Sequence, residues 1–292
     1  MKRTTAFAVA VLSLAACGPS DRTRPGDNGG GPDGGGGSNG SGNQDGCSDA
    51  AKIVYVVDEN NTLSQFDPST KTFHDLGTLN CPAQVLATPF SMAIDRSAAA
   101  WVLYNSGELF HVDTSSASLP CTATNWQSSN GLVNFGMGFS TDQAGGSTDT
   151  LFIAGGGMTM TSSSTLAKLD TTNFSASTVG TVTGWPELTG NSNAELWGFF
   201  PDATSPRVEK INKTSGAPVT TYPLASIAGD PMAWAFAFWG GDYWVFLQRS
   251  TDSATTVYQV DGTNGTIKGT TPTNTRVIVG AGVSTCAPVV IQ

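Results

Sequence analysis

Short runs of alternating hydrophobic and polar residues fill the chain from residue 47 to residue 292, separated by Gly, Asn, Asp, Ser and Thr. Alternation with a period of two puts successive side chains on opposite faces of a β-strand. This region contains no long run of apolar residues at helical spacing. The pattern therefore predicts an all-β domain built from many short strands and turns.

One element recurs five times in this region: an apolar strand, an Asp or Asn with a small polar turn, and a second short strand. The recurring residues, spaced by 42 to 57 positions, are Asp67, Asp113, Asp170, Asn212 and Asp261. This spacing is typical of the four-stranded blades of a β-propeller. Asp and Asn cap such turns by accepting a hydrogen bond from a backbone N–H two residues later. We interpret the five residues as structural, because calcium sites need several carboxylates close together.

A second element, rich in Gly, Ala and Ser, precedes four of these turns and suits the crowded axis of a propeller. It occupies residues 89–95, 136–142, 187–191 and 234–242. The first blade lacks it, but residues 282–285 near the C-terminus resemble residues 138–141. We predict five blades, with the C-terminal strand pairing with the first blade and so removing the free edges. Six blades are the alternative, because poorly matched stretches such as 122–135 leave room for another blade.

The N-terminus has the features of an export signal. A basic start precedes an apolar run about half as long as a membrane-spanning helix. Residues 14–17, Leu-Ala-Ala-Cys, match the bacterial lipobox, in which cleavage leaves Cys17 as a lipid-modified N-terminus. An ordinary secretory signal ending near Ala16 is the alternative. Gly18 follows where Asp would indicate inner-membrane retention, so we expect an outer-membrane lipoprotein that faces the periplasm or the cell surface.

Residues 18–46 are rich in Gly and contain no hydrophobic side chain. Such a segment cannot bury enough apolar surface to offset its backbone entropy, and we predict a disordered tether with a reach of about 30 Å. The expected organisation is a signal peptide over 1–16, the lipidated cysteine and tether over 17–46, and a propeller over 47–292.

The cysteines that remain after Cys17 are even in number, which indicates two disulfides in an exported domain. They lie tens of residues apart, so a zinc site is not expected. Closure of the ring makes Cys47 and Cys286 neighbours. Cys81 and Cys121 each follow the outer strand of adjacent blades. We therefore predict the disulfides Cys47–Cys286 and Cys81–Cys121.

Composition and net charge limit the classes of partner that the protein is expected to bind. The chain carries 14 basic and 23 acidic residues, for a net charge of −9, which argues against binding to a nucleic-acid backbone. With 35 glycines and 13% charged residues, neither a coiled coil nor a helix bundle is expected. The glycines at 155–157 do not precede a helix with Lys, as a phosphate-binding loop requires. We expect no cofactor and a monomer anchored to the membrane by lipid.

Candidate binding residues gather around the inner strands of the fourth and fifth blades: Trp185, Glu187, Trp234 and Trp239. Aromatic faces beside acidic and amide groups suit sugar rings. The alternative is that aromatic residues fill the contacts between blades, which is the preferred interpretation for Phe236 and Phe238. Glu187 begins its inner strand, on the face where propeller ligands bind.

No catalytic or metal-binding residue is assigned. Glycoside hydrolysis normally needs two carboxylates, and Glu187 is one. Asp95, Asp142 and Asp242 follow the inner strands at equivalent positions, which indicates structural turn residues on the opposite face. The two histidines, His74 and His111, are expected on an outer strand and a third strand, too far from the axis for a catalytic triad or a metal site.

Four phrases of the sequence, at residues 187–190, 196–201, 234–242 and 280–288, resemble predicted outer-membrane lipoproteins of the myxobacterial type that carry a propeller. The resemblance covers nearly all of residues 47–292 and implies the localisation and the fold, but no activity. The expected function is a lipid-anchored binding module for a glycan or an envelope protein. A hydrolase using Glu187 and a purely structural lipoprotein are the alternatives.

Overall fold

The computed structural model describes residues 46–128 and 131–290. The predicted signal peptide, Cys17 and nearly all of the tether lie outside these residues. The described chain contains two short 3-10 helices, η1 (Asp49–Lys52) and η2 (Ala225–Ile227), and twenty strands. No helix in this part of the chain is long and apolar enough to cross a membrane.

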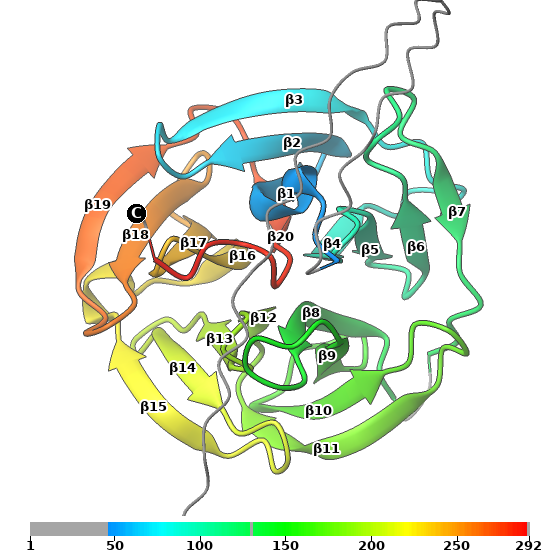
Figure 1. The fold of residues 1–292 in the computed structure, drawn as a ribbon. Coiled ribbons are helices and arrows are strands. Elements are labelled where there is room, and N and C mark those ends of the chain that lie inside the picture. Colours follow the sequence, from blue (N-terminus) through cyan, green and yellow to red (C-terminus); the bar gives the residue numbers. More distant parts are fainter. Residues whose placement is uncertain (1–45, 129–130, 291–292) are drawn as a thin grey trace, which may run out of the picture. The chain divides into compact units, whose positions relative to one another are not determined.

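The strands form five four-stranded antiparallel sheets arranged as the blades of a ring (Figure 1). From the axis outward, blade A contains β20 (Ile278–Gly282), β1 (Val54–Asp58), β2 (Thr62–Asp67) and β3 (Thr72–Thr78). Blade B contains β4 (Pro89–Ile94), β5 (Ala100–Tyr104), β6 (Leu109–Val112) and β7 (Cys121–Ala123). Blade C contains β8 (Asn134–Thr141), β9 (Asp149–Gly156), β10 (Ser163–Leu169) and β11 (Ala176–Thr183).

Blade D contains β12 (Glu187–Gly190), β13 (Leu196–Phe200), β14 (Arg207–Ile211) and β15 (Pro218–Pro223). Blade E contains β16 (Pro231–Trp239), β17 (Asp242–Arg249), β18 (Thr256–Asp261) and β19 (Ile267–Pro272). The protein is therefore a five-bladed β-propeller, as predicted. The alternative of a sixth blade is wrong, because residues 122–135 hold the end of β7, a loop and the start of β8.

The ring is closed by the C-terminal strand, which confirms the predicted closure. β20 pairs antiparallel with β1, with Tyr55 opposite Gly282 and Val57 opposite Gly280. The inner strands run in the same direction along the axis and contact one another through small residues. A Cβ added at Gly136 would overlap the carbonyl oxygen of Pro186 on the neighbouring blade. Small residues at the axis are thus required by backbone-to-backbone contact between blades.

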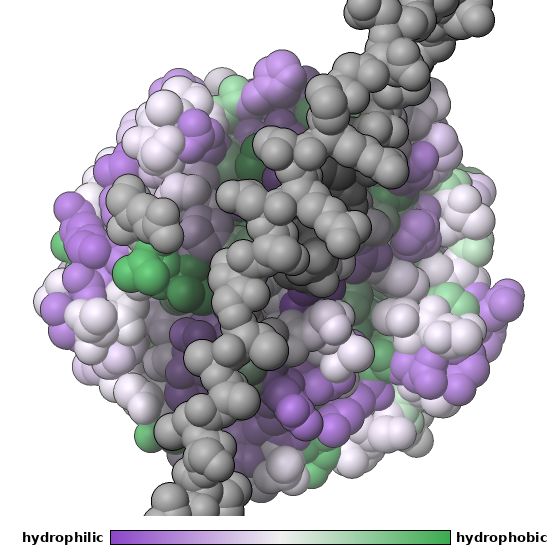
Figure 2. Space-filling model, viewed as in Figure 1, coloured by the Kyte–Doolittle hydropathy of each residue, from purple (hydrophilic) through white to green (hydrophobic). Residues whose placement is uncertain are grey.

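We call the face where the inner strands begin the top face and the face where they end the bottom face. Figures 1 and 2 show the bottom face, with η1 and the C-terminal segment toward the viewer. Outside the grey atoms, hydrophilic and weakly polar residues cover most of this face in Figure 2.

Hydrophobic side chains fill the contacts between neighbouring blades. Between blades D and E, for example, Trp197 and Phe199 form a cluster with Phe236, Phe238 and Tyr243. Phe236 and Tyr243 stack with their ring centroids 5.7 Å apart. The preferred interpretation of Phe236 and Phe238 as packing residues is confirmed.

The five recurring Asp and Asn residues cap their own turns on the bottom face. Each accepts a hydrogen bond of 2.7–2.9 Å from the backbone N–H two residues later, in the pairs Asp67–Ser69, Asp113–Ser115, Asp170–Thr172, Asn212–Thr214 and Asp261–Thr263. Hydrogen bonds from the hydroxyl and then from the backbone N–H of Thr263 lower the pKa of the Asp261 carboxyl to about 2. The structural interpretation of these residues is confirmed.

Both predicted disulfides, Cys47–Cys286 and Cys81–Cys121, are present. One detail differs: Cys121 begins the outer strand of blade B and does not follow it. The residues before Cys121, which we expected to form that strand, make a turn in which Leu119 bonds back to Ser116. Disulfides persist in oxidising compartments, so the protein is extracellular or periplasmic.

Candidate functional site

A hollow of about 270 Å³ opens at the axis on the top face, and we call it the axial hollow. Four of the five blades contribute side chains to it. Its apolar wall includes Phe90, Met232, Trp234, Val277 and Val279, and its polar lining includes Glu59, Thr88, Asn105, Glu187 and Gln248. A concave site with an aromatic wall and a few convergent polar groups is the usual form of a small-ligand site.

Glu187 lies at the base of the axial hollow, where it joins three blades. It is the first residue of β12 and is 2% exposed. Its carboxyl Oε2 accepts a 2.8 Å hydrogen bond from the Ser91 hydroxyl of β4, across the ring. Its carboxyl also accepts a bond from the backbone N–H of Met137 in β8.

Burial raises the pKa of the Glu187 carboxyl well above its usual range, and the bonds from Ser91 and Met137 oppose this shift in part. No ion pair found among the described residues includes Glu187. Burial therefore favours the neutral, protonated form of the carboxyl. In this form it can donate one hydrogen bond and still accept others.

Trp234 provides the aromatic wall, beside Phe90 of blade B. It lies near the start of β16, is partly exposed and packs on the hydrophobic cluster between blades D and E. Two amides complete the lining. Asn105 is held by bonds to Thr88, and Gln248 donates to the carbonyl of Asp252. The structure thus brings Trp234 and Glu187 together, as the sequence predicted.

Trp185 is not among the residues that line the axial hollow. It precedes β12, is 7% exposed and packs against Gly156 of blade C. Gly184, directly before it, has a left-handed backbone with φ 99°. Its indole N–H is buried with no hydrogen-bond partner.

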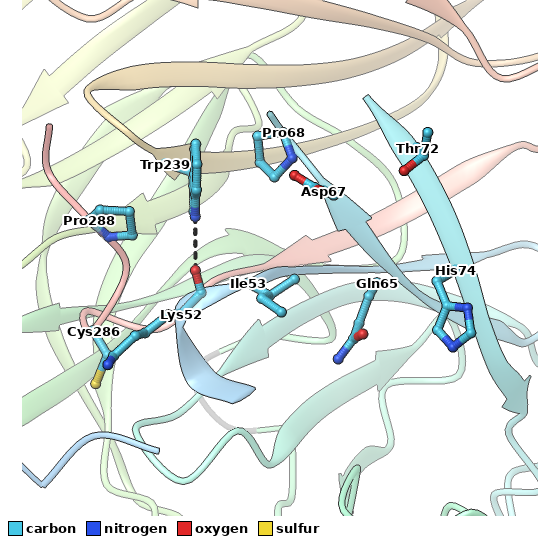
Figure 3. A pocket seen from close by; sticks show the side chains of 10 residues that line it. All are labelled: Lys52, Ile53, Gln65, Asp67, Pro68, Thr72, His74, Trp239, Cys286 and Pro288. Atoms are coloured by element: carbon cyan, nitrogen blue, oxygen red, sulfur yellow. Dashed lines mark hydrogen bonds between the residues drawn. The ribbon is translucent and has the colours of Figure 1, made fainter. Parts of the chain in front are cut away.

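Trp239 lies on the bottom face, at the other end of β16 from Trp234. It lines a hollow of about 710 Å³ between blades A and E, together with Ile53, Pro68 and Pro288 (Figure 3). We call this the lateral hollow. The indole N–H of Trp239 donates a 2.8 Å bond to the carbonyl of Lys52, which fixes the ring. The structure therefore separates Trp239 from the other candidate residues.

The three aspartates that follow inner strands lie on the bottom face and have partners of their own. Asp95 accepts bonds from the backbone N–H groups of its turn, and Asp142 accepts one from the Thr150 hydroxyl. Asp242 pairs with Lys268 at 2.8 Å. Their predicted place, away from the ligand face, is confirmed.

The histidines also lie where the sequence put them. His74 is on β3, the outer strand of blade A, and His111 is on β6, the third strand of blade B, where its ring meets Trp101 edge to face. In residues 46–128 and 131–290, no group of three or more His, Cys, Asp or Glu side chains is arranged to hold a metal ion.

Sequence reasoning missed Ser91, Glu59 and Gln248. Ser91 is a small polar residue in an inner strand, which by itself indicates only a crowded axis. Glu59 and Gln248 lie at the top ends of second strands in blades A and E. An alignment of the residues at the top end of each blade would have placed Glu59 and Gln248 near Glu187.

No protein-family model and no curated protein matches this chain. Among solved structures it is similar to a protein from Lactobacillus plantarum, at 14% identity and a TM-score of 0.44, over 80% of this chain and 72% of the other. It is also similar to a luciferin-regenerating enzyme, at 14% identity and a TM-score of 0.43, over 79% and 94%. The propeller of Dos1 is a further example, at 13% identity and a TM-score of 0.41, over 76% and 56%. At these identities the similarity concerns the fold alone.

Proposed function

We propose that the protein is a lipid-anchored binding module of the cell envelope that takes a neutral sugar residue of a glycan in its axial hollow. The observation that carries this proposal is the placement of the Trp234 ring and the buried Glu187 carboxyl around one hollow. A sugar ring presents an apolar C–H face and a set of hydroxyls. An aromatic wall suits the first, and an acid that both donates and accepts suits the second.

The lining favours a neutral ligand over an anionic one. Lys and Arg are absent from the described lining of the axial hollow, and Glu59 stands at its edge. An anionic group would find no cation there. Asn105 and Gln248 carry amide groups, which bind hydroxyls without adding charge.

The anchor belongs to this proposal as well. It rests on the lipobox at residues 14–17 and on the disulfides, which require an oxidising compartment. Bacteria grown with an alkyne-labelled fatty acid should label the native chain and leave the Cys17→Ser variant unlabelled. Labelling of both chains, or of neither, contradicts a lipid at Cys17.

The glycan proposal is tested on a glycan array with the intact chain and two matched variants. Trp234→Leu and Trp239→Leu remove one indole each from opposite ends of the same strand and keep apolar bulk. We expect a confined set of bound glycans that Trp234→Leu loses and Trp239→Leu keeps. A blank array with the native chain, or loss of binding with Trp239→Leu alone, overturns the proposal.

A hydrolase is the second candidate, because Glu59 lines the same hollow as the buried Glu187 and provides a second carboxylate. A protonated Glu can act as the general acid, with the other carboxylate as base or nucleophile. Hydrolysis predicts that bound oligosaccharides release reducing sugar, and that both Glu187→Gln and Glu59→Gln abolish the release. Binding without release excludes this candidate.

A further inference from the structure

Exposed hydrophobic residues gather on the top face. Seven large hydrophobic residues of the described chain are exposed, and five of them lie on this face. They are Val85 and Leu86 in the β3–β4 loop, Met158 and Met160 in the β9–β10 loop, and Met232 near the start of β16. The other two, Val219 and Val290, lie apart on an outer strand and near the C-terminus. Exposed apolar groups that cluster in this way mark interaction sites.

Val85 and Leu86 occupy the two central positions of a tight turn and are each 93% exposed. The turn closes with a 3.0 Å bond from the Ala87 N–H to the Gln84 carbonyl. Leu86 has φ 69°, in the left-handed region that Gly or Asn normally occupies in such a turn. Neither side chain belongs to a hydrophobic cluster of the described core. Packing within the fold therefore gives no reason for bulky apolar residues at these positions.

The turn is held firmly at its base by blade B. The Gln84 N–H donates a 2.9 Å bond to the Glu108 carboxylate, and the Thr88 N–H donates a 3.2 Å bond to the Asn105 side chain. Across from the turn lies Met158, and the two sides enclose a hollow of about 420 Å³ that Asn105 and Asn134 also line. We call it the B–C hollow. The wall formed by the turn is held in place before any partner arrives, which lowers the entropic cost of binding.

Charge on the top face favours a cationic partner. Glu108, at the base of the turn, takes part in none of the ion pairs found in the described chain. The described loops of this face contain no Lys. Its arginines are already paired with carboxylates, in the pairs Arg207–Glu209, Arg249–Asp252 and Arg276–Asp75.

We propose that the B–C hollow binds a polypeptide segment in which apolar side chains alternate with Lys or Arg. The apolar side chains pack between Leu86 and Met158, and a basic side chain pairs with Glu108. A second copy of this chain would bring the same carboxylates face to face, and an anionic lipid surface would be repelled by them. This surface is separate from the axial hollow, although Asn105 borders both.

The test is a selection of random displayed peptides on the intact chain, followed by affinity measurements with the selected peptides. Leu86→Asn removes the apolar side chain and tolerates the left-handed backbone, so the fold is kept. Glu108→Gln keeps an acceptor for Gln84 and removes the charge. Val219→Asn is the matched control, since Val219 is exposed but far from the hollow.

We expect the selected peptides to be enriched in both basic and apolar residues. Leu86→Asn should weaken their binding at least about tenfold, because a buried Leu side chain contributes that much or more. Glu108→Gln should weaken binding and reduce its dependence on salt. Val219→Asn should leave the affinity unchanged, and Trp234→Leu should too, which separates this proposal from the glycan proposal.

Several results overturn the proposal. Selected peptides without basic residues, or equal affinity for the native chain and Leu86→Asn, show that the hollow is not the site. A dimer in sedimentation that Leu86→Asn dissociates assigns the surface to a second copy. Binding to phosphatidylcholine vesicles that Leu86→Asn abolishes assigns it to a lipid surface.

Discussion

The two faces of the propeller are built differently. On the bottom face, segments from both ends of the domain fill the axis: Ser284 donates to the carbonyl of Ala51, Thr285 donates to Asp149, and Arg96 pairs with the same aspartate. On the top face the axis stays hollow, and the buried carboxyl of Glu187, whose pKa is raised by burial, lies at its base. Five large hydrophobic side chains are exposed on the same face.

The difference follows from the loops. The bottom loops between third and outer strands repeat one chemistry, an Asp or Asn that caps its own turn, and local bonds fully determine their shape. The top loops share no such pattern. A bulky apolar residue with positive φ occurs on both faces, but Leu119 and Phe174 of the bottom turns pack on the hydrophobic core, whereas Leu86 of the top face is 93% exposed. A function is expected at positions where neither packing nor turn chemistry explains the type of residue. The bottom face therefore closes the ring, and we propose that the top face binds the ligand.

The largest effect should come from opening the bottom closure. Replacing Cys47 and Cys286 by Ser removes a cross-link between residues 239 positions apart, and chain entropy predicts a loss of about 5 to 6 kcal/mol in the free energy of unfolding. The matched control is Cys81→Ser with Cys121→Ser, 40 positions apart, which should lose about 3 to 4 kcal/mol. Denaturant titration measures both, and a larger loss in the control contradicts the role of the closure.

Removing an ion pair should likewise destabilise the protein more on the bottom face than on the top face. On the bottom face the Asp149 side chain is 7% exposed and bonds to Arg96 and Thr285, so Asp149→Asn should cost about 3 kcal/mol by removing a largely buried ion pair. On the top face Asp252 pairs with Arg249 closer to solvent, and Asp252→Asn should cost about 1 kcal/mol. Equal losses of stability for the two variants in thermal unfolding would contradict this difference between the faces.

Two glutamates should respond to pH in opposite directions. Because burial raises the pKa of the Glu187 carboxyl in the folded state, the folded chain keeps a proton on this group that the unfolded chain releases above about pH 4.3. The stability of the native chain therefore falls as pH rises toward the raised pKa, by about 1.4 kcal/mol for each unit of pKa difference. Glu187→Gln removes this fall, so the variant should be more stable than the native chain at pH 8 and equal to it near pH 4.

Glu195 on the bottom face is the control for this titration. Although partial burial opposes it, hydrogen bonds from Lys210 and Asn191 lower the pKa of the Glu195 carboxyl. Its stabilising effect is present above the unfolded pKa and is lost as pH falls, so Glu195→Gln should destabilise the protein at neutral pH. Denaturant titrations at several pH values compare the two, and the same sign for both variants would contradict the assignment.

The smallest effect concerns the turn of Leu86. An Asn at this position tolerates the left-handed backbone better than Leu, so Leu86→Asn should raise the free energy of unfolding by up to about 1 kcal/mol. Val219→Asn, at an exposed position in a strand, should change it little or lower it slightly. If Leu86→Asn lowers the melting temperature markedly, Leu86 has a packing role and the top face is less open than we infer.

Most of the fold could be predicted because it is encoded locally. The spacing of the turn residues predicted the number of blades, and the small residues of the inner strands predicted which strands lie at the axis. Closure by β20 followed from the missing inner strand of blade A, and the pairing of Cys47 with Cys286 followed from closure. These inferences need only strand alternation and turn chemistry.

The site was predicted less completely because it depends on distances across the ring. The bond from Ser91 to Glu187 joins blades that are not neighbours and residues 96 positions apart, which no local pattern encodes. The separation of Trp234 from Trp239 was accessible, since five residues of extended strand span about 17 Å. Trp185 was grouped with Glu187 by proximity in sequence, but it precedes the strand and faces blade C.

The most direct test of a binding top face is amide hydrogen exchange of the intact chain, with and without the glycan that binds best on the array. We predict protection in the segments that surround the axial hollow, residues 88–90, 232–234 and 277–279, and unchanged exchange around Trp239 and Pro288. Protection confined to the lateral hollow on the bottom face would contradict the division of the molecule into a binding face and a closure face.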